Sequence, residues 1–204
     1  MANIATQRIQ REFNEVTRSD EVAKNLIAIE LVNNSLVDLR GRITGPPDTP
    51  YEGGVFHLEI KIPETYPFNP PKVKFVTRIW HPNISSVTGA ICLDILKDQW
   101  AAAMTIRTVL LSLQALLAAA EPDDPQDAVV AKQYKESHEL FKLTAKHWTS
   151  IYARANDGPI WSYQDFDGKI RKLKEIMSVD DHRARVALSS NNWDLDRATQ
   201  SLLS

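Results

Sequence analysis

The chain has 204 residues, of which 43% are apolar and 25% charged, a balance typical of a globular protein. Its formal net charge of −2 gives no general electrostatic attraction to nucleic acid or to an anionic membrane. The single cysteine excludes an intrachain disulfide and fits a reducing compartment. The segment MANIATQRIQREF carries charges where a signal peptide needs an apolar run, so we expect a protein of the cytosol or nucleus.

Residues 3–17 predict an amphipathic helix, because Ile9, Phe13 and Val16 share one face and Glu12 lies off it. Four runs of alternating residues follow, LIAIELV, VDLRGRI, VFHLEIKI and VKFV, separated by Asn, Gly and Pro turn residues. Short connections between consecutive strands favour an antiparallel meander.

Residues 77–100 show no clean period, and a long irregular segment inside a compact domain is often functional. A helix from Thr105 is apolar nearly all round, which predicts deep burial. Two further helices are expected, one capped by Asp127 and one over about 138–153.

Residues 155–162 predict a linker that contains Gly158-Pro159 and separates a core of residues 1–154 from a tail of residues 163–204. The tail holds three short helical patterns. In the first, Ile170, Leu173 and Ile176 are spaced three apart. A bundle this small is expected to be only marginally stable by itself. The whole pattern predicts an α+β fold: an N-terminal helix, a four-stranded antiparallel meander, C-terminal helices and a small three-helix bundle.

Cys92 lies in the irregular segment, shortly after turn residues that end at Gly89. A free cysteine is most often a small buried hydrophobe, and that alternative stays open for Cys92. An exposed thiol in a polar loop could instead react as a thiolate.

The motif His81-Pro82-Asn83 forms a stiff turn, because proline restricts its own backbone and that of the preceding residue. We interpret His81 as structural, bonding buried backbone groups. Asn83 could close a turn or stabilise an oxyanion with its amide. Farther along the chain, Glu121-Pro122-Asp123-Asp124-Pro125 is either a solvated acidic loop or a source of a carboxylate aimed at an amine. The spacing of the histidines and the single cysteine disfavours a structural zinc site.

In this order, the motifs YPFNPPKV, WHPN and GAICLDIL closely resemble the ubiquitin-conjugating enzyme family. The resemblance covers about residues 3–153 and implies the UBC core fold. The tail, ending in VALSSNNWDLDRATQSLLS, resembles a ubiquitin-associated (UBA) domain. The whole chain is therefore similar to class II ubiquitin-conjugating enzymes, which carry such a tail.

The resemblance implies a role for each residue of the motifs. Cys92 would accept the C-terminal carboxyl of ubiquitin as a thioester, Asn83 would stabilise the oxyanion, and Asp124 would position the acceptor lysine. His81 and Pro82 would shape the active-site loop. The implied partner contacts are Leu111 for donor ubiquitin, Phe68, Ala102 and Ala103 for ligases, and Arg8 and Arg11 for the activating enzyme.

Two positions depart from the family pattern. The ligase loop reads Ala101-Ala102-Ala103 where Ser-Pro-Ala is frequent, which narrows the expected choice of ligases. The tail reads Met177-Ser178-Val179 where Met-Gly-Phe is usual, so an apolar anchor and easy access to positive φ are lost. These losses weigh against ubiquitin binding by the tail, although Leu202 and Leu203 remain.

The implied partners are ubiquitin, the activating enzyme, ligases of the RING type and protein substrates, with no nucleic acid and no membrane. No prosthetic cofactor or metal is expected, and ATP would be consumed upstream by the activating enzyme. The resemblance also implies ubiquitin chains that direct proteins to the proteasome.

Two other functions remain as alternatives. A cysteine hydrolase would use Cys92, His81 and Asn83, but it needs a base able to reach the thiol. A non-catalytic ubiquitin scaffold would leave Cys92 without a role.

Overall fold

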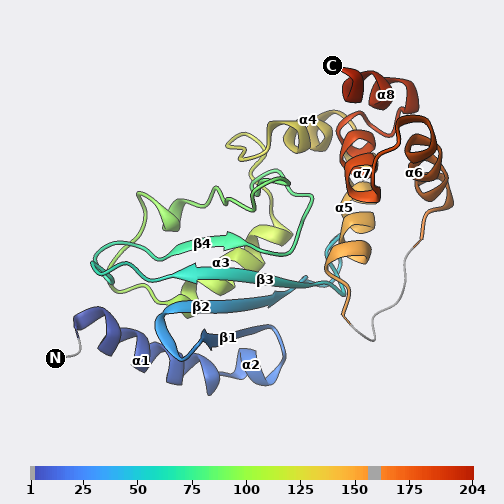
Figure 1. Ribbon diagram of the computed structural model, residues 1–204. Helices are drawn as coiled ribbons and strands as arrows, with labels where there is room; N and C mark the ends of the chain where they lie inside the picture. Colours follow the sequence, from blue (N-terminus) through green and yellow to red (C-terminus); the bar gives the residue numbers. More distant parts are fainter. Residues whose placement is uncertain (1–2, 156–161) are drawn as a thin grey trace.

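The computed structural model describes residues 3–155 and 162–204 (Figure 1). Of the predicted linker 155–162, residues 156–161 lie outside the described residues. The elements are α1 (Ile4–Thr17), α2 (Asp20–Ala23), β1 (Ile27–Val32), β2 (Ser35–Thr44), β3 (Val55–Lys61), β4 (Lys72–Phe75), the 3-10 helix η1 (Asp94–Leu96), α3 (Ile106–Ala118), α4 (Ala128–Glu136), α5 (His138–Tyr152), α6 (Gln164–Met177), α7 (Asp181–Ser190) and α8 (Leu195–Leu203).

The four strands form one antiparallel sheet in the order β1-β2-β3-β4, so the predicted meander is confirmed. Alternate side chains of β2 and β3 are buried, and they face α3, which crosses behind the sheet (Figure 1). Gly41 allows a close approach of α3 to the sheet, because a Cβ atom there would lie 2.9 Å from Ile60 Cδ1 and 3.2 Å from Leu110 Cδ2. This packing fixes α3 beneath the strands.

Glu12 is buried in α1, whereas the sequence pattern placed it off the apolar face. The Tyr66 hydroxyl donates to both carboxylate oxygens at 2.9 and 2.7 Å, and Ile106 N donates to Oε1 at 2.8 Å. These donors replace the lost hydration, and the positive end of the α3 dipole adds to the stabilisation. The carboxylate therefore joins α1 to the start of α3.

The prediction that α3 is buried nearly all round is only partly confirmed. Leu110 and Leu113 are buried, whereas Arg107 and Ala115 are exposed. Asp127 caps α4 as predicted, since its side chain accepts a hydrogen bond from Val130 N.

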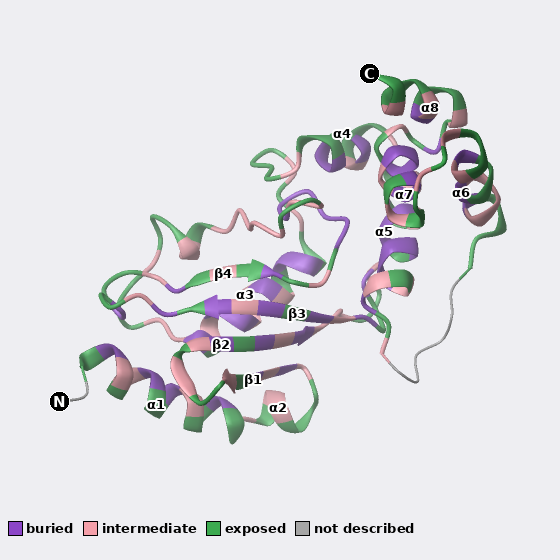
Figure 2. Ribbon diagram, in the orientation of Figure 1, coloured by how far each residue is buried: buried purple, intermediate pink, exposed green. Residues whose placement is uncertain are grey.

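The three tail helices form a bundle that packs on α5, and its inner faces are buried (Figure 2). The Trp148 indole donates to Ser189 Oγ at 2.9 Å, and the Trp193 indole donates to Thr144 Oγ1 at 2.9 Å. Gln133 Nε2 of α4 donates to Ser189 O at 3.1 Å. Contact with α4 and α5 thus adds to the small core that the bundle could build by itself.

Ile176 is 54% exposed, although the pattern placed it on the buried face with Ile170 and Leu173. A spacing of three residues drifts by about 60° per step around an α-helix, so Ile176 lies well off the line set by Ile170. No helix within the described ranges is long and apolar enough to cross a membrane.

Candidate active site

Cys92 lies in the irregular segment between β4 and α3, where its backbone N donates to Asn83 O at 2.8 Å. The side chain is partly exposed, so Cys92 is not a buried hydrophobe. Its Sγ lies 3.4 Å from Asp124 Oδ2 and 3.3 Å from Lys97 Nζ. The sulfur therefore has a carboxylate and an ammonium group within contact distance.

These two charges act on the sulfur in opposite directions. The ammonium of Lys97 favours a thiolate, whereas the carboxylate of Asp124 disfavours it. The hydrogen bond to the Cys92 sulfur, followed by their charge interaction, raises the pKa of Lys97. Lys97 consequently stays cationic at neutral pH and is available to a negatively charged sulfur.

Asn83 links the cysteine segment to the acidic loop. Its Nδ2 donates to Glu121 O at 2.8 Å and to Asp124 O at 2.9 Å, and its Oδ1 accepts from Glu121 N at 2.8 Å. Both amide hydrogens are thus engaged by backbone carbonyls. Asn83 holds the main chain of the loop that places the Asp124 carboxylate beside the sulfur.

His81 has the structural role that the sequence suggested. Its Nδ1 accepts a hydrogen bond from Asn83 N at 2.9 Å, and its Nε2 lies 2.9 Å from Leu116 O. Burial lowers the pKa of His81 to about 4, so the ring is neutral and Nε2 carries the proton. Pro82 O accepts from the backbone N–H groups of residues 126 and 127. Because both nitrogens of His81 are engaged, the hydrolase alternative cannot use His81 as its base.

The residues expected to contact ligases lie together on the surface. Phe68 is 71% exposed, and Ala102 and Ala103 are exposed on the neighbouring loop. The Trp100 indole donates to Pro67 O at 2.8 Å and joins the two loops. These residues therefore form one surface with a protruding aromatic ring.

The remaining predicted contacts differ in how open they are. Arg8 Nη2 donates to Ala102 O and Met104 O, both at 3.0 Å, so much of this guanidinium is used within the protein. Arg11 is exposed on α1, and Leu111 is half-buried on α3. Of the two arginines, Arg11 is the more available to a partner.

The tail residues predicted to touch ubiquitin also differ in how exposed they are. Met177, Val179 and Leu202 are partly buried and pack within the tail core, whereas Leu203 is 73% exposed. Ser178 ends α6 in the left-handed conformation, with φ of 52°, a conformation that glycine adopts most easily. Ubiquitin binding by the tail stays a prediction.

Lys97 is the residue of this candidate site that the sequence did not indicate. It follows Cys92 by five residues, and η1 turns the chain so that its side chain reaches back to the sulfur. A lysine in an irregular segment gives no periodic signal, so only the proximity to the lone cysteine could have indicated it. Among the described residues, no group of His, Cys, Asp and Glu is arranged to hold a metal ion.

Comparison with known proteins relates this chain to one family. A family model described as ubiquitin-conjugating enzyme matches residues 8–149. The chain is 68% identical over 204 residues to the ubiquitin-conjugating enzyme E2-22 kDa of Drosophila melanogaster and 66% identical to the human ubiquitin-conjugating enzyme E2 K, with full coverage of both chains in each comparison. Among solved structures, the E2 domain of a Toxoplasma gondii ubiquitin-conjugating enzyme matches with a TM-score of 0.68 and 53% identity, over 72% of this chain and 98% of that one.

Proposed function

Because the chain belongs to the ubiquitin-conjugating enzyme family, a family of transferases that act through a cysteine thioester, we propose that Cys92 carries the ubiquitin. It is the only cysteine of the sequence. The observation that carries the proposal is its partly exposed sulfur between Asp124 and Lys97.

The first step is exchange of one thioester for another. The Cys92 thiolate attacks the carbonyl that joins ubiquitin to the activating enzyme, a new C–S bond forms, and the thiolate of the activating enzyme leaves. The proton lost by Cys92 passes to solvent. Lys97 assists by placing its positive charge 3.3 Å from the attacking sulfur.

The second step is attack by a lysine amine on the Cys92 thioester. A free lysine has a pKa of about 10.4 and is almost wholly protonated at neutral pH. A nearby carboxylate would raise an amine pKa, so Asp124 orients the amine and accepts its proton late, as the C–N bond forms and the C–S bond breaks. Lys97 stabilises the thiolate that leaves.

Asn83 serves this step by holding the backbone of the Asp124 loop. Direct donation to the oxyanion would require Asn83 Nδ2 to exchange a hydrogen bond to Glu121 O or Asp124 O for one to the substrate. Both roles slow the transfer when the amide is removed, and they differ in their effect on the stability of the fold.

Ligases would dock on the surface formed by Phe68, Ala102 and Ala103. The exposed ring of Phe68 supports this, because a protruding aromatic side chain is a typical binding anchor. Phe68→Ala should then abolish stimulation by a RING ligase and leave unassisted discharge onto free lysine in place.

The test is a charging reaction with ubiquitin, activating enzyme and ATP, resolved on gels with and without a thiol reductant. Cys92 should give an adduct that the reductant removes, and Cys92→Ala should give none. Cys92→Ser is the matched control, because its oxygen ester resists the reductant. An adduct that persists on Cys92→Ala would overturn the proposal.

A further inference from the structure

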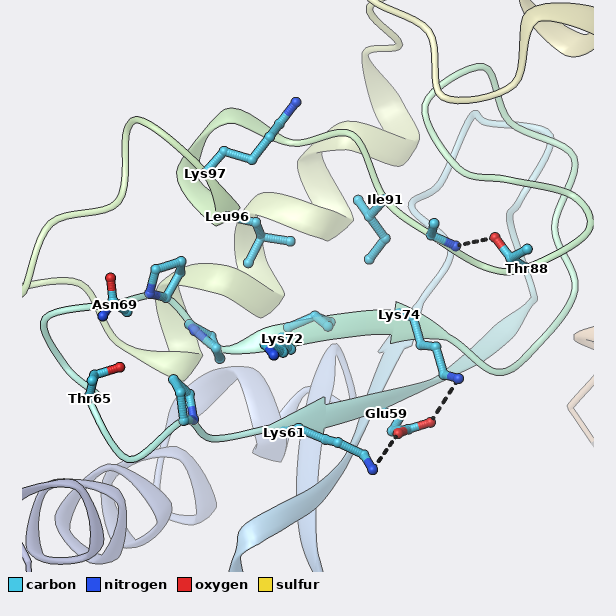
Figure 3. Close-up of a pocket in the computed structure, with 15 residues that line it drawn as sticks. Glu59, Lys61, Thr65, Asn69, Lys72, Lys74, Thr88, Ile91, Leu96 and Lys97 are labelled. Carbon is cyan, nitrogen blue, oxygen red and sulfur yellow. Dashed lines mark hydrogen bonds and ion pairs between the residues drawn. The ribbon is translucent and has the colours of Figure 1, made fainter.

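A basic groove of about 980 Å³ opens beside the active site, between strands β3 and β4 and the segment 88–97 (Figure 3). Four lysines and one acidic residue line it, which gives a local charge of +3 in a chain whose net charge is −2. The charged lining residues are Lys61, Lys72, Lys74, Lys97 and Glu59.

One end of the groove lies near Cys92, which is not itself part of the lining. Lys97, at one end of the lining, has its Nζ atom 3.3 Å from Cys92 Sγ. Ile91, the residue before Cys92, and Leu96, the residue before Lys97, also line the groove, and Figure 3 shows their side chains between β4 and Lys97. A chain that extends from the sulfur along the groove would therefore meet apolar side chains and lysines together.

Only part of this positive charge is neutralised within the protein. Lys61 and Lys74 lie 3.4 and 3.3 Å from the Glu59 carboxylate, one on each oxygen (Figure 3). Burial raises the pKa of Glu59, but the hydrogen bonds and charges of Lys74 and Lys61 outweigh it, so the pKa is lowered and the carboxylate is ionised. No ion pair among the described residues engages Lys72, which is exposed at the start of β4.

The acidic loop beside the sulfur carries the opposite charge. Asp124 lies 3.4 Å from Cys92 Sγ, on the loop that also holds Glu121 and Asp123. An acceptor amine is cationic until it reacts, so this loop attracts it and the lysines repel it. A segment that places its lysine beside Asp124 and its acidic side chains in the groove would match the negative charge of the acidic loop and the positive charge of the groove.

We propose that this basic groove binds an acidic segment of the acceptor protein next to the lysine that is modified, so that the enzyme prefers lysines with acidic neighbours. The inference rests on the proposed function of Cys92 and adds a determinant of acceptor choice. Nucleic acid fits less well, because Glu59 lies within the groove and the whole chain is slightly acidic.

The test uses enzyme charged on Cys92 and two synthetic acceptor peptides in a single-turnover discharge. Both peptides carry one lysine, flanked on both sides by glutamates in the first and by glutamines in the second. The wild-type enzyme should discharge onto the glutamate peptide roughly tenfold faster, and this ratio should fall as salt is added. Discharge onto free lysine gives the reference rate for each variant.

Two substitutions should move the ratio in opposite directions. Lys72→Glu should bring it close to one, because it reverses the charge at the start of β4. Glu59→Gln should raise it above the wild-type value, because it releases Lys61 and Lys74 from their ion pairs. A gain of preference cannot come from misfolding, so this variant protects the test from a loss of stability. Lys172→Glu, an exposed site on α6, is the matched control and should leave the ratio unchanged.

Equal rates for the two peptides with the wild-type enzyme would overturn the groove proposal. A preference that survives in Lys72→Glu, or falls in Glu59→Gln, would also overturn it, as would an RNA oligonucleotide that competes at lower concentration than the glutamate peptide. If the enzyme is charged with ubiquitin normally but shows no preference for the glutamate peptide, only the groove proposal fails. Failure to form the thioester on the wild-type enzyme counts against the proposed function.

Discussion

Asn83→Ala tests whether this amide holds the Asp124 loop or donates to the oxyanion. The two roles predict different losses of stability, because loop-holding depends on hydrogen bonds that the structure shows. The substitution removes the two bonds that Nδ2 donates, to Glu121 O and Asp124 O, and the one that Oδ1 accepts from Glu121 N. The loop of Asp124 is then held to the segment of Cys92 less firmly, because only bonds farther along the loop remain, such as those from the N–H groups of residues 126 and 127 to Pro82 O.

The expected cost follows from these three bonds. A neutral hydrogen bond contributes about 1 kcal/mol net, and a buried group left without a partner costs about 1–3 kcal/mol. Glu121 and Asp124 are exposed, so water can reach part of their backbone after the change. We expect the free energy of unfolding to fall by about 1–3 kcal/mol, below the full sum of the separate penalties.

Function should be affected in one step only. Charging of Cys92 needs no acceptor amine, so Asn83→Ala should still form the thioester at nearly the normal rate. Discharge onto free lysine should slow by roughly tenfold to a hundredfold, because the Asp124 carboxylate is held less firmly beside the sulfur. Asp124→Asn should slow discharge as well, and the double variant should be less impaired than the product of the two single effects.

The assays are urea denaturation, charging on a non-reducing gel and single-turnover discharge onto lysine. Unchanged unfolding free energy, with a loss of about 10²–10³ in discharge and independent effects in the double variant, would refute the loop-holding argument and favour direct donation to the oxyanion. Equal losses in charging and discharge would indicate a general folding defect instead.

Three further outcomes are expected. Burial and, less strongly, Arg185 lower the pKa of His147 to about 4, so the unfolded chain takes up the proton first. Between pH 6.5 and 4 this residue should reduce the unfolding free energy by up to about 3 kcal/mol, in addition to the similar contribution of His81. His147→Gln, which keeps an acceptor for Arg185, should remove the His147 part of this loss in denaturation curves measured across that range and leave the His81 part. Ser178→Gly should raise the unfolding free energy by about 0.5–1 kcal/mol, because glycine adopts φ of 52° without strain, and an unchanged midpoint would contradict this. Lys97→Gln should slow charging of Cys92 at pH 7 by roughly fivefold, and added salt should narrow the gap to the wild type, since the pair is open to solvent.

The repeating patterns of the chain predicted most of its elements, because burial of one face imposes a period that is visible in the sequence. The alternating runs became β1 to β4 in a meander, and the cap at Asp127 starts α4 as expected. Glu12 shows the limit of this reasoning. Its buried carboxylate forms an ion pair with Arg8 one turn earlier and accepts hydrogen bonds from Tyr66 and Ile106. Only the arginine is close in sequence.

The motifs around Cys92 likewise indicated the family, and they pointed to Cys92 as the residue proposed to carry ubiquitin. Local sequence carries such information when the chemistry depends on residue types in a fixed order. The same letters could not say that Asn83 would use both amide hydrogens on the acidic loop, or that Lys97 would turn back to the sulfur. Those facts depend on how an irregular segment folds against its neighbours.

The position of the tail on α5 also depended on the tertiary structure. Three short helices were readable from their apolar spacing and from the cap at Asp194. Their docking required Thr144 and His147, polar residues that the helical pattern did not mark as buried. A periodic signal reports which face of a helix is apolar, whereas a polar contact between two helices arises only when folding brings a donor and an acceptor within hydrogen-bonding distance.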